Sequence, residues 1–445
     1  MREHPIELFN RRSSTREFLL NKTELKVKDD PGERMAHSTL NDLLKQFPDM
    51  LYGTNFIDTA MKALKSSTQF SAMVMRIDGE SVSGEGFNTP LIIDVLKTLD
   101  FFCRDKKAIW GMMEEDVPGA FFPGIHENVC LSLSKTLQRN LFTVRSETVT
   151  IGVAAYPTLD YEKHQILDNA GKALDHAMFF GPSSAVAFDA ISLNISGDNR
   201  YQRGDINGAI EEYRKALKID PINVNVYNSL GVCYGVLKRY KKALAFFRRA
   251  VELDHQEVMA IYNIGLVHML RDDRKKALEN FNNAYLLAPE VFEIAFHIGK
   301  CHLDSKEYNK ATEFLEKAVE IQPDSALALS CLGQCYTALE ITDKAIKAFQ
   351  NAIKKNPKDA EALSGLGYLF EVQNENPEIA TMFCQESVMI SPDNGLFQHR
   401  LGRLYLKQDR LDDATKAFLI ASELGYDSTP FIQEIEHRQT KPSSP

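Results

Sequence analysis

The pattern of apolar and polar positions changes at about residue 190 of this 445-residue chain. Beyond that point, apolar residues recur at helical spacing in paired segments, as in YNSLGVCYGVL followed by KKALAFFRRAVEL. Glycines keep the same phase at intervals of 34 residues, with a final interval of 35. They are Gly197, Gly231, Gly265, Gly299, Gly333, Gly367 and Gly402. The pattern predicts about seven repeats, each built from two amphipathic helices.

Alanines and prolines hold the same phase as the glycines. Alanine follows most glycines by 12 and 19 positions, as Ala243 and Ala250 follow Gly231. Such small residues are expected where two helices approach closely, because a larger side chain would hold the helices apart. Proline closes most repeats, as at Pro357, and it ends the second helix because it lacks an N–H donor.

This combination resembles the tetratricopeptide repeat, with its Leu-Gly-x2-Tyr, Ala-x3-Phe and closing Pro. Two copies that fit the pattern closely are Leu230-Gly231…Tyr234…Ala243…Phe247 and Leu332-Gly333…Tyr336…Ala345…Phe349…Pro357. The resemblance implies an all-α solenoid of helix-turn-helix repeats over residues 190–424. Residues 425–445 are then expected to form a capping helix and a tail.

The first 189 residues follow a different pattern. Residues 1–45 are polar and contain a linker, KTELKVKDDPGER, ahead of the helical stretch MAHSTLNDLLKQF. Runs of strand length at 70–77 and 148–155 alternate with helical periodicity at 89–102, 126–141 and 164–179. Strands that alternate with helices predict an α/β sandwich over residues 46–189.

Several segments of this region resemble the GGDEF family of diguanylate cyclases, in the family's order. They are Asp49–Gly53 with Asn55, MVMRID at 73–78, Pro123-Gly124, TVTIGVAAYP at 148–157, and 170–177 followed by Gly181. The resemblance implies the family's fold and its reaction, which joins two GTP molecules with the help of two divalent ions.

The residues that carry this chemistry in the family are replaced here. Arg76 stands where the family has a metal-binding Asp, and only Asp78 remains at that strand end. Glu114 and Glu115 take the place of the two signature glycines in one alignment, and Met112 and Met113 do so in a shifted alignment that recovers the acids. Met178 takes the place of a phosphate-binding lysine. A cation at a ligand position repels a metal ion, which needs clustered carboxylates. We therefore predict a catalytically dead domain with no catalytic residue, metal or cofactor.

Other candidate sites lie in cysteine, histidine and glycine clusters. Cys331 and Cys335 share a helix face, and one repeat earlier lie His297, Cys301 and His302. One interpretation of this pattern is a metal site. We favour the other reading, in which the cysteines are small buried residues of helix packing. The segment Gly84-Glu85-Gly86 predicts a turn, because no Gly-Lys-Ser/Thr follows it.

Composition and charge limit the kinds of partner and the cellular location that we expect. The chain has 52 Lys and Arg against 61 Asp and Glu, a net charge of -9, which argues against nucleic acid as a partner. It has no apolar run long enough for a membrane span and no signal-peptide core at its start. Seven cysteines without CxxC spacing fit a reducing compartment. We expect a cytoplasmic protein.

The repeat resemblance also implies a partner-binding groove. In the tetratricopeptide family the second, fifth, ninth and twelfth positions of each first helix face the concave side. Here they give an apolar and aromatic middle and a basic C-terminal end, suited to a protein or peptide partner. The family's carboxylate clamp is not matched, since Asn194 and Asp198 occupy its first two positions. The groove candidates are Asn225, Asn228, Tyr262, Leu266, Met269, Phe296, Lys300, Gln334, Tyr368, His399, Arg400 and Arg403.

These features together predict a non-enzymatic, bacterial-type signalling adaptor. The solenoid recruits a protein partner, and the degenerate domain acts as a regulatory or dimerising module, with a homodimer through that domain as one arrangement. An alternative is a sensor that binds a nucleotide or cyclic di-GMP without turnover. A weaker alternative is an active diguanylate cyclase with a remodelled site.

Overall fold

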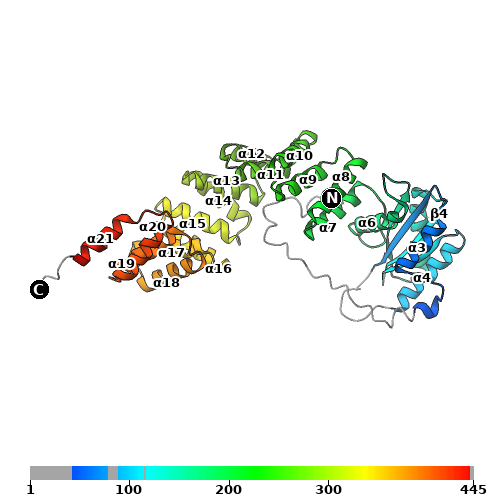
Figure 1. Cartoon of the computed structure of the whole chain (residues 1–445), viewed down its shortest axis with the longest axis horizontal. Coiled ribbons are helices and arrows are strands. Elements are labelled where there is room, and N and C mark those ends of the chain that lie inside the picture. The colour runs from blue at the N-terminus through cyan, green and yellow to red at the C-terminus, as the bar shows by residue number, and fades with distance from the viewer. Residues whose placement is uncertain (1–42, 79–88, 115–116, 441–445) are drawn as a thin grey trace. The chain divides into compact units, whose positions relative to one another are not determined.

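The computed structural model describes residues 43–78, 89–114 and 117–440 of the chain (Figure 1). It forms two compact units, residues 1–263 and 264–445, whose boundary falls within helix α11 (Val258–Leu270). The predictions for residues 1–42, for the turn at Gly84–Gly86 and for Glu115 lie outside the described residues. None of the helices in the described part of the chain combines the length and the apolar content that crossing a bilayer requires.

The first unit contains a mixed six-stranded sheet. Its strands are β1 (Leu51–Tyr52), β2 (Phe70–Ile77), β3 (Ile109–Glu114), β4 (Val117–Pro123), β5 (Val149–Tyr156) and β6 (Ala185–Ala187), in the order β1-β3-β4-β2-β5-β6. The central strand β2 runs antiparallel to both β4 and β5, and Ala72 pairs with Phe121 on one side and Ala154 on the other. The edge strands β1 and β6 are parallel to their neighbours.

Helices cover both faces of this sheet. They are α3 (Gly53–Ala63), α4 (Thr89–Arg104), α5 (Glu127–Val144) and α6 (Ile166–Met178). Odd-numbered residues of β2, such as Met73, pack in one core with Leu99 of α4 and Leu137 of α5. The opposite face meets α3 and α6. A Cβ on Gly152 of β5 would lie 2.1 Å from backbone atoms of α6, so glycine is required for that helix to approach the strand.

The predicted α/β region is confirmed, with strands and helices within a few residues of the expected ranges. The sequence pattern alone did not predict β1, β3, β4 or β6. Strands β3 and β4 form a hairpin whose segments, IWGMME and VPGAFFP, carry glycine or proline and lack the alternation that marks a half-buried strand. The order β2-α4-β3-β4-α5-β5 is a split βαβ arrangement.

A contact of Lys163 holds the C-terminal end of α3 against the rest of this region. The Lys163 ammonium group donates hydrogen bonds to the carbonyl oxygens of Leu64, Lys65 and Ser67, at 3.0, 2.9 and 2.7 Å. These carbonyls follow the C-terminal end of α3, where backbone oxygens have no partner within the helix. A cation is favourable at this end because it complements the helix dipole.

Paired helices fill the chain from residue 190 onward, as predicted. In the first unit they are α7 (Ala190–Gln202), α8 (Ile206–Ile219), α9 (Val224–Val236) and α10 (Tyr240–Leu253), with α11 at the boundary. The second unit has α12 (Arg274–Leu287), α13 (Phe292–Asp304), α14 (Tyr308–Ile321), α15 (Ala326–Ala338), α16 (Thr342–Lys355), α17 (Ala360–Gln373), α18 (Pro377–Ile390), α19 (Gly395–Lys407), α20 (Leu411–Glu423) and α21 (Thr429–Thr440).

The phased glycines let the two helices of a repeat touch. A Cβ on Gly231 would lie 2.4 Å from the ring of Phe247, and one on Gly333 would lie 2.6 Å from the ring of Phe349. Both rings are buried on the second helix of the same repeat. The glycine phase in the sequence therefore reports the closest point between the helices of each pair.

Replacing Gly333 with alanine should destabilise the repeats around it by about 1–3 kcal/mol, because the Phe349 ring must move. Amide hydrogen exchange in α15 and α16 measures this. Gly171→Ala in α6 is the control, because no atom lies within 4 Å of its added Cβ and alanine favours a helix. Equal loss of protection in both variants would contradict the packing argument.

Candidate functional site

Most groove candidates of the first unit are buried. Tyr262 has no exposed surface and Asn228 is buried, while Asn225 is half-buried. The Nδ2 of Asn263 donates to Oδ1 of Asn228 at 3.1 Å, so this amide serves contact between successive repeats. The expectation that Tyr262 offers an aromatic anchor to a partner is therefore wrong, because its ring belongs to the core.

The apolar candidates of the second unit are also largely packed inside it. Leu266 is fully buried, Phe296 is buried, and Met269 is half-buried. The ring of Phe296 stacks on that of Phe292 with centroids 5.7 Å apart. These side chains stabilise neighbouring repeats, so the predicted apolar middle of the groove is smaller than the sequence suggested.

The predicted basic end is neutralised by partners within the second unit. Arg403 Nη2 lies 3.0 Å from Oε1 of Glu371, and Lys407 Nζ lies 2.8 Å from the same oxygen. The Glu371 side chain is only 1% exposed, so its carboxylate needs these cations. The expectation of a free basic surface at Arg403 is wrong for that reason.

Arg400 is held in the same cluster. Its Nη1 donates to Oγ of Ser364 at 3.0 Å, and its guanidinium lies 5.0 Å from the ring centroid of Tyr368. Burial lowers the pKa of Arg400 from its usual value. Sequence reasoning missed Ser364 and Glu371, although they occupy the fifth and twelfth positions of the sixth repeat and the repeat phase could have identified them.

Some side chains of this surface remain open to a partner. Leu327 is 60% exposed on α15, and the Lys300 side chain is 39% exposed while its Nζ lies 2.9 Å from Asp304. Gln334 and Tyr368 are half-buried. A cavity of about 420 Å³ opens beside Glu371 between α17 and α19, with Phe370, Asn374, Pro377, Leu404, Lys407 and Gln408 in its lining.

His399 ties the last repeat to the C-terminal helix instead of facing a groove. It is buried, its Nδ1 lies 2.8 Å from Oγ of Ser428, and the rings of Tyr426 and Phe431 lie 4.6 and 5.0 Å from its own. Burial, together with Arg403 and Arg400, lowers the pKa of His399 to about 4. Glu371 and Asp427 oppose this effect. The fold therefore needs a neutral imidazole here.

Acid should loosen α21 through His399. With a folded pKa of about 4 and an ordinary value of 6.5, the unfolded state binds a proton first as pH falls. The stabilisation is complete above pH 6.5 and is lost between 6.5 and 4, by on the order of 3 kcal/mol at most. Hydrogen exchange of α21 across this range should show the loss, and His399→Phe should remove it.

The prediction fails if α21 in His399→Phe keeps the same pH dependence as the unaltered chain. His297 of α13 also has its pKa lowered to about 4 by burial, so global unfolding would report both histidines. Exchange measured in α21 alone separates the two.

The Asp78 carboxylate, just after the end of β2, is held by protein donors. The Asp78 carboxylate accepts hydrogen bonds from Oγ1 of Thr148 and Oγ1 of Thr150 at 2.7 and 2.6 Å, and from the Ser183 amide at 2.7 Å. Arg76 Nη1 lies 3.8 Å from Sδ of Met178. A carboxylate whose oxygens are taken by protein donors, with a guanidinium nearby, does not fit a divalent cation.

The cysteine and histidine cluster behaves as packing. Cys301, Cys331 and Cys335 are buried, and burial raises the pKa of the Cys331 thiol to about 12. His302 lies 2.8 Å from a Glu307 oxygen. The residues that the structure describes contain no group of three or more His, Cys, Asp or Glu side chains placed to hold a metal ion.

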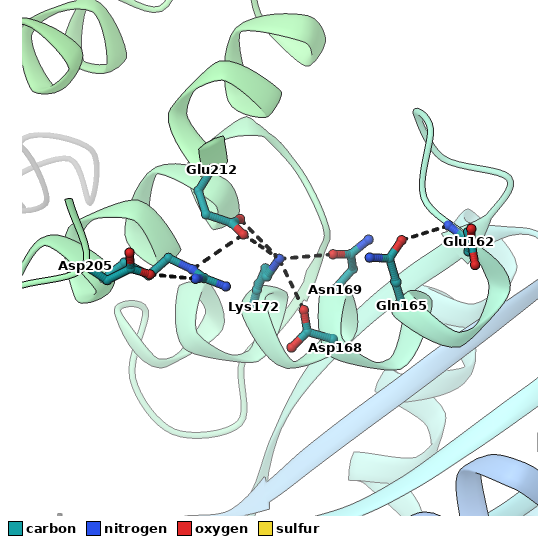
Figure 2. A network of polar contacts seen from close by, with 8 residues as sticks. Glu162, Gln165, Asp168, Asn169, Lys172, Asp205 and Glu212 are labelled. Atoms are coloured by element: carbon teal, nitrogen blue, oxygen red, sulfur yellow. Dashed lines mark hydrogen bonds and ion pairs between the residues drawn. The ribbon is translucent and has the colours of Figure 1, made fainter. Parts of the chain in front are cut away.

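A buried ion pair links the sheet region to the first repeat (Figure 2). The Lys172 ammonium group of α6 lies 3.1 Å from each carboxylate oxygen of Glu212 on α8, and 3.2 Å from Asp168. The side chains of Lys172 and Glu212 are 10% and 6% exposed. Arg200 Nε lies 3.7 Å from Glu212 and extends the network toward the solenoid.

Further contacts surround this pair. Lys218 Nζ donates to Asp160 at 3.0 Å, and Lys215 Nζ lies 4.3 Å from the ring centroid of Tyr161. Helix α6 packs on α7, and only two residues separate β6 from α7 (Figure 1). Helix α6 thus covers the open end of the solenoid that a preceding repeat would otherwise cover. The division predicted at residue 189 falls inside this unit.

Removing one partner of the pair should destabilise the first unit strongly. Lys172→Met leaves the Glu212 charge buried, which costs about 3–5 kcal/mol, while Lys172→Met with Glu212→Leu should recover most of it. Hydrogen exchange in both α6 and α8 measures the effect. Glu252→Gln, which breaks the exposed Arg249–Glu252 pair, is the control and should cost less than about 1 kcal/mol. A loss confined to α8 would contradict a shared interface.

Family models match the helical region. Residues 197–235 match the TPR repeat model, residues 224–257 and 342–394 match two tetratricopeptide repeat models, and residues 273–352 match the model of anaphase-promoting complex, cyclosome, subunit 3. The chain therefore carries tetratricopeptide repeats, which confirms that part of the sequence prediction. The search of curated proteins found no match.

Several solved structures are similar to part of this chain. MamA is 30% identical over 37% of this chain and 96% of its own, with a TM-score of 0.33. YrrB, described as a TPR protein with an unusual peptide-binding site, is 23% identical over 43% and 97%, with a TM-score of 0.39. PilF of Pseudomonas aeruginosa is 19% identical over 47% and 95%, with a TM-score of 0.44.

Proposed function

We propose that this protein is a non-catalytic scaffold that recruits a protein partner through its tetratricopeptide repeats. The observation that carries the proposal is the series of helix pairs itself, since such repeats suggest a protein–protein interaction scaffold. Each first helix presents a row of side chains at a fixed spacing, which suits an extended or helical segment of another protein.

The partner surface that we propose lies on the second unit. Leu327 supplies an exposed apolar contact, Gln334 and Tyr368 supply polar and aromatic ones, and Lys300 supplies a charge. An apolar side chain that is exposed on a first helix costs free energy in water and gains it when a partner covers it. Arg400 and Arg403 lie over the ring of Tyr368 and contribute less to binding, because Arg403 is paired with Glu371 and Arg400 already donates to Ser364.

The α/β region serves, in this proposal, as a cap and regulatory module rather than as an enzyme. Its resemblance to GGDEF domains extends to the segment order, and the contacts of Asp78 and Arg76 support the absence of cyclase turnover. A homodimer through this region and a cytoplasmic location belong to the same proposal. The alternative is a sensor that binds a nucleotide or cyclic di-GMP without turnover.

Site-specific photocrosslinking tests the surface. A benzoylphenylalanine at position 327 should crosslink to the partner in a lysate of the source cells, because this side chain lies in the contact. The same probe at position 286 is the matched control, since Leu286 is also an exposed leucine, at 80%, but lies on the second helix of its repeat. Equal crosslinking at both positions, or none at 327, would refute the proposed surface.

Calorimetry distinguishes the nucleotide-sensor alternative from the proposed scaffold function. Titration of GTP or cyclic di-GMP into the full chain should give no binding heat, and incubation with GTP and Mg²⁺ should give no cyclic di-GMP. Binding that disappears in Arg76→Ala would favour the sensor.

A further inference from the structure

A dense run of positive charge lies on the second repeat of the first unit. Residues 236–251 contain six basic residues and no acidic one, in a chain whose net charge is -9. All six side chains are exposed. We call them the cationic face of α10; Lys238 and Arg239 lie just before the helix, and the others on it are Lys241, Lys242, Arg248 and Arg249.

The helix geometry places these charges together. Lys241 and Arg248 are seven residues apart, which is about two turns, so they lie on the same side of α10. Lys242 and Arg249 have the same spacing on the adjoining stripe. Ala245 is exposed between the two pairs, so no bulky side chain separates them.

Most of these cations lack a carboxylate partner. Arg249 Nη1 lies 3.1 Å from Glu252, and Lys242 Nζ lies 5.4 Å from the ring centroid of Tyr234. Lys238, Arg239, Lys241 and Arg248 form no ion pair with any residue that the structure describes. On α16, Lys344 pairs with Glu316 and Lys355 pairs with Asp324, while Lys347 and Lys354 form no ion pair with any residue that the structure describes.

The repeat phase gives an internal comparison. The fifth repeat has Glu340, Ile341, Asp343, Lys344, Gln350 and Asn351 at the six equivalent positions, and only Lys344 is a cation. The scaffold at these positions is the same pair of helices, so the repeat architecture does not require the positive charge. Its concentration in the second repeat is a property of this sequence.

The charges also work against the stability of α10. Lys241 and Lys242 lie in the first turn, where the helix dipole disfavours cations, and Arg239 at the N-cap makes no side-chain capping bond. The equivalent helices α8 and α12 are capped by the side chains of Asp205 and Asp273, whereas α14, α16 and α20 lack a side-chain cap as α10 does.

We propose that the cationic face of α10 binds an acidic segment of a partner protein. The proposal rests on the scaffold function and adds a second contact, distinct from the surface around Leu327. An extended acidic segment of six or seven residues would span the helix, which is about 21 Å long. A long nucleic acid would meet the negative charge of the rest of the chain, whereas a short acidic segment meets only this face.

Fluorescence anisotropy on the full chain tests this. The probe is a short fluorescein-labelled peptide of alternating glutamate and serine, with a glutamine version as its neutral counterpart. Lys241→Glu with Arg248→Glu should weaken binding of the acidic probe by about tenfold or more at low salt, since two attractions become repulsions. The matched control is Lys347→Glu with Lys354→Glu, which makes the same change of charge on exposed positions of α16.

Loss of binding in the α10 variant alone, together with weakening by salt and no binding of the glutamine probe, supports the proposal. Equal losses in both variants, or no binding by the unaltered chain, overturn it. Tighter binding of a single-stranded oligonucleotide or of anionic lipid vesicles to the same face also overturns it. Leu327→Asp should leave probe binding unchanged, so failure of the surface around Leu327 and failure of the cationic face are separate results.

Discussion

The buried ammonium group of Lys172 is the interaction on which the arrangement of the first unit depends. It extends from α6, which covers the sheet, to Glu212 of α8, which belongs to the first helical repeat. Neither charge can be left alone, because an unpaired ion inside a protein costs several kcal/mol. Gly152 lets α6 pack closely on β5, so the position of α6 on the sheet is fixed. The Lys172–Glu212 pair then holds the first repeat against α6. The sheet and the first repeats are therefore held as one body.

The structural features that recur in every repeat could be predicted from the sequence, whereas contacts that occur only once could not. The glycine phase located every helix pair because each copy repeats the same close contact, such as Gly231 against Phe247. The repeat phase also predicted which face of each first helix points to the concave side. It did not predict how deeply each side chain on that face is buried. Tyr262 was expected on a surface, but its side chain is fully buried. The Lys172–Glu212 pair joins residues 40 positions apart, and no local pattern marks such a contact.

The basic side chains of the solenoid are of two kinds: those with partners inside the protein, which have a structural role, and those without, which are candidates for binding. Arg403 and Lys407 pair with Glu371, and Arg400 contacts Ser364 and Tyr368, so these cations have partners inside the second unit. The cations on α10 have no such set of partners. A count of basic residues in the sequence treats both groups alike. Only the geometry shows that the predicted basic end is internal and that the cations of α10 remain available.

The Asp78 carboxylate, just after the end of β2, has a structural role. Asp78 accepts hydrogen bonds from Thr148 and Thr150, which flank the start of β5, and from the amide of Ser183, which lies just before β6. Strand β6 leads within two residues into α7. The carboxylate thus orients the chain at the point where the sheet passes into the solenoid, close in sequence to the helix that carries Lys172. Loss of Asp78 would therefore loosen the same junction that the buried ion pair secures.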